Sequence, residues 1–134
     1  MARNTKMRRF LDIGGEGRYR NAWCLNPRSV KTLGPERGQP IPRLILGRAD
    51  HIPCADGSLD CILVERTPLT ARALREIART IAPAGRIILR HIPLPWQDRH
   101  ATAKAILPGQ VRERLICRHG RVLLETQFVL DRPA

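Results

Sequence analysis

The feature that most constrains the fold lies near the start of the chain, where the short apolar run Phe10–Ile13 leads into Gly14, Gly15 and Gly17. This pattern predicts a strand followed by a tight turn. Glycine at such a turn lets the backbone approach a nucleotide-like ligand at the carboxyl end of a parallel sheet, where a Cβ would collide with it. The sequence therefore predicts a binding crevice after the first strand, although glycine turns also follow strands that bind nothing.

The 134 residues are enough for one domain, residues 1–134, and the 43% hydrophobic content favours a folded globule. No apolar run approaches the roughly 18 to 20 residues that span a bilayer, and no secretory signal is apparent. We therefore expect a soluble, cytoplasmic protein that makes no membrane contact.

Strand and helix patterns alternate along most of the chain. Leu74, Ile77, Ala78 and Ile81 follow the helical spacing most clearly. Residues 110–131 change to the alternation of a β-hairpin around a His119-Gly120 turn. The pattern predicts an α/β fold with an open, mostly parallel twisted sheet and a C-terminal antiparallel hairpin. The expected strands are Phe10–Ile13, Ser29–Leu33, Arg43–Gly47, Cys61–Val64 and Arg86–Leu89, the expected helices are Arg18–Leu25, Thr70–Ala82 and Gln97–Leu107, and Met1–Arg8 is expected to form a basic arm.

The formal net charge of +12 is carried almost entirely by arginine, because only three of the 24 basic residues are lysines. Such a charge attracts polyanions, so nucleic acid and an acidic protein are both candidate partners. The arginines are spread along the chain without a stacking set of aromatic residues, and no helix-turn-helix or RNA-binding signature accompanies them. The four cysteines and four histidines are too dispersed to predict a metal site.

A longer pattern joins three segments, Phe10–Gly17, Gly47–Val64 and Ala73–Leu89. In order, they read as a glycine turn after a strand, an acidic loop leading into a buried strand, and a helix followed by a turn and another strand. This pattern resembles the class I, Rossmann-like methyltransferases that use S-adenosylmethionine, and in particular a compact, divergent example of the type 11 group. The resemblance covers residues 9–93 and implies both the fold and the cofactor S-adenosylmethionine.

The resemblance also implies roles for individual residues. The three glycines of the turn would approach the amino-acid end of the cofactor, and Asp12 would hold its ammonium group. Glu36, an acid about 20 residues beyond the turn, would accept both ribose hydroxyls. The remaining predicted contacts are Asp50, His51 and Ile52 beside the adenine, and Glu65 at the mouth of the site. Each acid also has an ordinary alternative, as a turn residue or as solvated loop charge.

The chain departs from the family pattern at three points. The turn has one glycine fewer than usual: aligned without a gap, Glu16 and Arg18 replace two glycines, and with a one-residue deletion the glycines fit but the turn is shorter. Arg48 stands where the family usually has an acid. The chain also has no room for the segments that close the site in relatives, so we expect a second subunit, from a homo-oligomer or a partner protein, to close it. Glu65 and His91 are the expected bases if the acceptor must lose a proton.

Three functions therefore remain open. The first is methyl transfer from S-adenosylmethionine to an unidentified acceptor, which can be a small molecule. The second is a non-catalytic accessory or regulatory subunit that binds an acidic partner. The third is a basic module that binds nucleic acid on the same scaffold.

Overall fold

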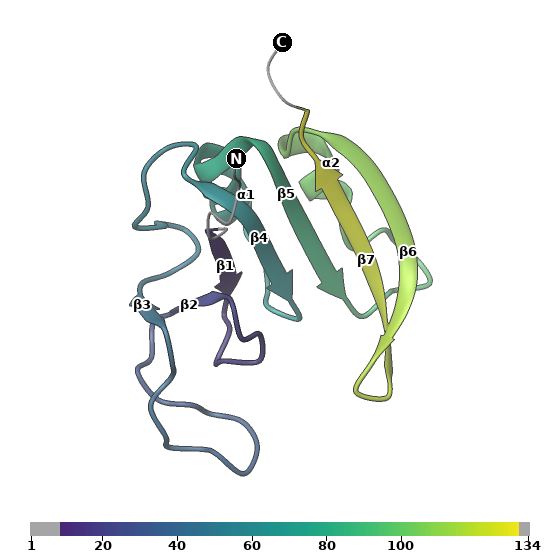
Figure 1. Cartoon of the computed structure of the whole chain (residues 1–134). Helices are drawn as coiled ribbons and strands as arrows, with labels where there is room; N and C mark the ends of the chain where they lie inside the picture. Colours follow the sequence, from purple (N-terminus) through teal and green to yellow (C-terminus); the bar gives the residue numbers. More distant parts are fainter. Residues whose placement is uncertain (1–8, 132–134) are drawn as a thin grey trace, which may run out of the picture.

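The computed structural model describes residues 9–131, which form one seven-stranded sheet in the order β3-β2-β1-β4-β5-β7-β6 (Figure 1). The five strands from β3 to β5 are parallel, and β7 and β6 are antiparallel to their neighbours. The expected fold class is confirmed, and β1 lies inside the sheet. The elements are β1 (Phe10–Ile13), β2 (Trp23–Asn26), β3 (Leu44–Leu46), β4 (Leu59–Glu65), α1 (Ala71–Thr80), β5 (Ile81–His91), α2 (Ala101–Ile106), β6 (Gln110–Arg118) and β7 (Arg121–Val129).

Helix α1 begins after Thr70, whose side-chain hydroxyl accepts a hydrogen bond from the backbone N–H of Ala73 at 3.1 Å. It ends two residues earlier than the periodicity predicts, because Ile81 is already extended and pairs with Leu59 of β4. Pro83 explains the early end, since proline disfavours helical backbone in the residue before it. Helix α2 is likewise shorter than expected. Neither described helix has the length and apolar composition of a membrane-spanning helix.

Both helices lie on the same face of the sheet, and the hydrophobic core fills the space between them and the strands (Figure 1). Leu74 and Ile77 of α1 are fully buried, as are Ile62 of β4 and Ile87 of β5. Phe128 of β7 belongs to the same cluster and has no exposed surface. The two helices therefore cover the apolar face of the sheet, as expected for a layered α/β fold.

Two expected elements are wrong. Residues 18–25 do not form a helix, because β1 and β2 are joined by residues 14–22 alone, and a helical crossover between parallel strands needs about a dozen residues. Residues 29–33 form no strand but a loop, in which Val30 makes one isolated bridge with Pro40. The prolines and glycines between residues 27 and 43 explain this irregular path.

These short and irregular connections leave the second face of the sheet without a helix among residues 9–131. We call it the open face. The strand registers place together on it Phe10, Asp12, Cys61, Leu63, Glu65, Arg86, Ile88, Arg90, Leu123, Glu125, Gln127, Arg112, Arg114 and Arg118. The expected basic arm, Met1–Arg8, lies outside the described residues.

Candidate functional site

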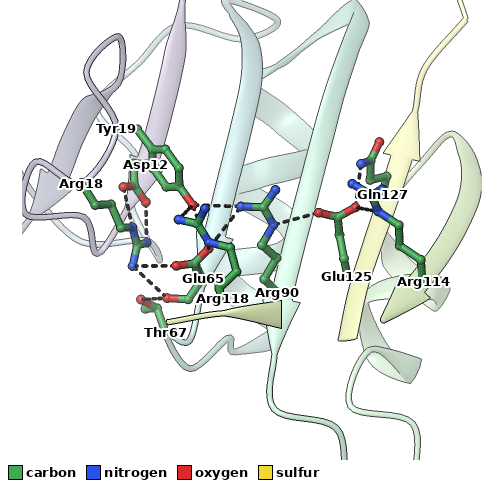
Figure 2. Close-up of polar contacts among 10 residues, drawn as sticks. All are labelled: Asp12, Arg18, Tyr19, Glu65, Thr67, Arg90, Arg114, Arg118, Glu125 and Gln127. Atoms are coloured by element: carbon green, nitrogen blue, oxygen red, sulfur yellow. Dashed lines mark hydrogen bonds and ion pairs between the residues drawn. The ribbon is translucent and has the colours of Figure 1, made fainter. Parts of the chain in front are cut away.

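The carboxyl ends of β1 and β4 lie side by side, and the first acid there is Asp12, whose side chain is completely buried. Arg18 forms a bidentate contact with this carboxylate, because its Nε donates to Oδ2 at 2.9 Å and its Nη2 donates to Oδ1 at 2.7 Å (Figure 2). Burial raises the pKa of Asp12, although the hydrogen bonds from Arg18 act in the opposite direction. The acid expected to hold a ligand's ammonium group is thus already paired within the chain.

The second acid, Glu65 at the end of β4, is surrounded by a hydroxyl and several guanidinium groups that can donate hydrogen bonds to it. Its Oε1 accepts a hydrogen bond from the Tyr19 hydroxyl at 2.9 Å and one from Arg90 Nη1 at 3.2 Å. Arg18 and Arg118 form further ion pairs with it at 3.7 and 3.5 Å. Burial acts to raise the pKa of Glu65, but these hydrogen bonds and cations outweigh it and lower the pKa overall.

A third acid extends the same system across β5 and β7. Glu125 accepts a hydrogen bond from Arg90 Nε and one from Arg114 Nε, each at 2.8 Å. Arg90 therefore bridges Glu65 and Glu125 (Figure 2). We call the whole system the ion network, and its members are Asp12, Arg18, Glu65, Arg90, Arg114, Arg118 and Glu125.

Tyr19 is the neutral centre of the ion network. Its hydroxyl donates to Glu65 and accepts from Arg90 Nη1 at 2.9 Å and from Arg118 Nη2 at 2.5 Å. The guanidinium carbons of Arg18 and Arg118 lie 5.7 and 5.1 Å from the centre of its ring. Both distances are within the range of a cation–π interaction.

The glycine turn packs against the chain's own atoms. A Cβ on Gly14 would lie 2.4 Å from Thr67 Oγ1, one on Gly15 would lie 2.3 Å from Asp12 Oδ2, and one on Gly17 would lie 2.7 Å from Pro42 Cγ. Gly14 and Gly17 also have positive φ angles, of 77° and 109°. Protein neighbours and backbone conformation therefore account for all three glycines without a ligand.

A cavity of about 260 Å³ nevertheless opens beside this turn. It brings the glycine turn and Glu36 together, as the sequence predicts. Glu36 forms an ion pair with Lys31 there, and Glu16 accepts hydrogen bonds from the backbone and hydroxyl of Thr32. The cavity is lined by Gly14, Glu16, Gly17, Arg18, Lys31, Leu33 and Glu36.

The predicted adenine contacts do not line this cavity. Asp50 and His51 are exposed at a turn that Arg48 and His51 close. Ile52 is a core residue with 1% of its surface exposed. Its backbone N–H donates to Glu76 of α1 at 2.9 Å, and its carbonyl accepts from Arg79 at 2.8 Å. Both backbone groups of Ile52 are thus bonded to side chains of α1.

His91 and His100 lie beside a second cavity, of about 250 Å³, on the helix-covered face. His91 Nε2 lies 2.7 Å from the Thr67 carbonyl, and its Nδ1 lies 2.8 Å from His100 Nε2. The chain continues from His100 Nδ1 to the Thr126 hydroxyl, which donates to Glu113 at 2.6 Å. Both ring nitrogens of His91 are thus engaged, so the expected base has no nitrogen left for a substrate.

This chain of contacts begins at a carbonyl and ends at a carboxylate, so both of its ends only accept hydrogen bonds. All four contacts can carry a hydrogen only if one imidazole takes an extra proton. Burial opposes that protonation: it lowers the pKa of His91, and it lowers the pKa of His100 to about 4.

Among residues 9–131 no three histidine, cysteine or acidic side chains gather as metal ligands.

Sequence reasoning missed most of the ion network. Tyr19, Arg90, Arg114, Arg118 and Glu125 were not expected at a site, because no local motif marks them. One signal was present, namely an arginine at the end of the apolar run of β5 and an acid within that of β7. Only the pairing of Arg90 with Glu125 across the two strands turns that signal into a contact.

No protein-family model matches this chain, and no curated protein matches its sequence. Solved structures match it well in shape. A Thermotoga maritima S-adenosylmethionine-dependent methyltransferase superposes with a TM-score of 0.65 at 14% identity, over 92% of this chain and 82% of that one. The chain has the class I methyltransferase fold.

Two further solved structures show that methyltransferases with different substrates share this fold. A 16S rRNA (adenine(1408)-N(1))-methyltransferase from Catenulisporales acidiphilia, determined with S-adenosylmethionine, has a TM-score of 0.60 at 15% identity, over 95% of this chain and 86% of that one. An arsenic(III) methyltransferase from Chlamydomonas reinhardtii has a TM-score of 0.57 at 16% identity, over 96% of this chain and 65% of that one. The resemblance predicted from the three segments is confirmed, and it is a resemblance of fold.

Replacing Glu65 with Gln tests the ion network. The substitution removes a buried charge that faces several arginines, so we expect it to lower the free energy of unfolding by about 3 kcal/mol. Urea denaturation followed by circular dichroism measures the change. The matched control is Glu36→Gln, because that carboxylate is 59% exposed and paired with Lys31, and its loss should cost less than about 1 kcal/mol. Equal effects of the two substitutions would contradict this account of Glu65.

The buried histidines predict a pH-dependent stability. Their pKa values are lowered in the folded chain, so the unfolded chain binds more protons once the pH falls below about 6.5. We expect the free energy of unfolding to fall between pH 7 and pH 5, with a limiting slope of about 1.4 kcal/mol per pH unit for each histidine. His100→Gln should flatten this slope, whereas substitution of the exposed His119 by Gln should not. A pH-independent stability of the unsubstituted chain over this range would be the contrary result.

Proposed function

We propose that this chain is a non-catalytic, methyltransferase-like binding protein that acts as an accessory or regulatory subunit for an anionic partner. The observation that carries the proposal is the two-pronged contact of Arg18 with Asp12. The family resemblance assigns this acid to the ammonium group of S-adenosylmethionine, held directly or through water. Arg18 supplies a cation from within the chain instead.

The surroundings of Asp12 do not fit the cofactor either. Thr67, Asp12 and Pro42 already occupy the space that the glycines leave open. Glu36, which the resemblance assigns to the ribose, pairs with Lys31. A ligand would have to separate both ion pairs, and separating a buried one costs about 3 kcal/mol, equivalent to about a 100-fold loss of affinity.

The expected bases support the same conclusion. Glu65 is surrounded by Tyr19 and three arginines, and both nitrogens of His91 are engaged. General base catalysis needs a group within hydrogen-bond reach of the substrate's proton. The net charge of +12 instead favours a partner that carries negative charge.

Methyl transfer from S-adenosylmethionine to an unidentified acceptor is the second candidate. One observation favours it, namely the cavity that joins Gly14 and Gly17 to Glu36. The structural neighbours named above are S-adenosylmethionine-dependent methyltransferases, which adds to its support. In this case a second subunit, from a homo-oligomer or a partner protein, would have to close the site.

Calorimetric titration with S-adenosylmethionine and S-adenosylhomocysteine separates the two candidates. We expect no binding by the unsubstituted chain up to about 1 mM ligand. Arg18→Gly frees the Asp12 carboxylate and should allow S-adenosylhomocysteine to bind, whereas the control Arg20→Gly, a change at a neighbouring exposed arginine, should not.

A dissociation constant below about 1 mM for the unsubstituted chain would overturn the proposal in favour of the enzyme. Circular dichroism and thermal melting verify that each variant is folded. Arg18→Gln serves as a second variant if the glycine substitution does not fold. Failure of both folded variants to bind would show that Arg18 is not what closes the site.

A further inference from the structure

The open face presents cations outward and keeps its acids inward. The carboxylates of Asp12, Glu65 and Glu125 are at most 3% exposed. Arg114 is 66% exposed on β6, Arg112 is exposed on the same strand, and Arg86 is exposed on β5. A partner that approaches this face therefore meets guanidinium groups first, which favours an anionic partner.

A parallel sheet is usually covered on both faces, so the open face is a candidate binding surface for a partner. A second copy of the chain is disfavoured, because two such faces would bring like charges together. Arginine presents a planar fork that matches a phosphate with two parallel hydrogen bonds. The chemistry of the face therefore favours a chain of phosphates over an apolar surface.

Two aromatic rings lie at one end of this face. The rings of Phe10 and Tyr19 are 6.2 Å apart and both side chains are partly exposed. Arg18 and Arg118 flank Tyr19. The sequence predicted no stacking set, because the pairing of Phe10 with Tyr19 and the approach of Arg118 arise only in the folded chain. Aromatic rings beside arginines on a sheet are a surface on which unpaired bases stack.

We propose that the open face binds single-stranded RNA, with phosphates at Arg86, Arg112 and Arg114 and bases near Phe10 and Tyr19. This inference rests on the proposed binding function and names its partner. A single strand is favoured over a duplex, because stacking near Phe10 and Tyr19 needs unpaired bases, whereas a duplex keeps its bases inside its own stack. Single-stranded segments are chiefly a property of RNA, whose loops and ends expose their bases.

The test is the affinity of the full chain for a fluorescein-labelled RNA of 12 nucleotides, measured by fluorescence anisotropy at 50 to 200 mM salt. We expect binding that weakens steeply with salt. Arg86→Gln with Arg112→Gln should lower the affinity about tenfold and reduce the slope of log K against log salt by about 1.4, the value for two lost phosphate contacts. The matched control is Arg72→Gln with Arg75→Gln, because those exposed arginines lie on α1, which packs on the other face.

Three results would overturn the proposal. One is no RNA binding at 50 mM salt, and another is equal weakening by the two double variants, which would mean that net charge alone attracts RNA. The third is binding of poly-glutamate or inorganic polyphosphate as tightly as RNA, with the same loss in the open-face variant, which would identify an acidic protein or a bare polyanion as the partner. None of these titrations contains an adenosyl compound, so their failure is distinguishable from failure of the proposed function.

Discussion

The bidentate ion pair between Arg18 and Asp12 is the interaction on which the rest of the site depends. It places a cation at the carboxyl end of β1, next to Glu65, and so begins the alternation of acids and arginines that continues to Glu125. Buried acids of this kind are costly unless each is paired and hydrogen-bonded. The ion network meets that condition for all three carboxylates, and it thereby allows charged residues to lie on the interior strands of a sheet.

The short connection from β1 to β2 has consequences well beyond its own residues. Because residues 14–22 cannot hold a crossover helix, Arg18 and Tyr19 lie over the strands where a helix would otherwise pack. The same shortage leaves the open face without a helix among residues 9–131, whereas α1 and α2 cover the other face. The chain thus combines the sheet of the methyltransferase fold with a face that no helix among residues 9–131 covers. The RNA-binding proposal rests on this face.

Much of the fold was predictable, because it follows from local patterns. The apolar runs at β1, β3 and β4, the spacing of Leu74 and Ile77, and the alternation after Gln110 each predicted the right element. The helix expected at residues 18–25 was wrong, since its pattern was weak and the space available between two paired strands decided the outcome. At the site, Gly14, Gly17 and Glu36 line one cavity, and their predicted contacts with a cofactor stay predictions. The adenine contacts of Asp50 and His51 stay predictions, and Ile52 lies in the core.

The sequence by itself determined most of the strands and helices, the glycine turn and the excess of arginine, because periodicity, backbone freedom and charge are properties of neighbouring residues. Only the tertiary structure decided what the acids do. Asp12 and Arg18 are close in sequence, yet Glu65, Arg90, Arg118 and Glu125 join them only through strand register and the path of residues 14–22. A carboxylate pairs with the cations that the fold brings within hydrogen-bond distance, and spacing along the chain does not reveal which ones those are.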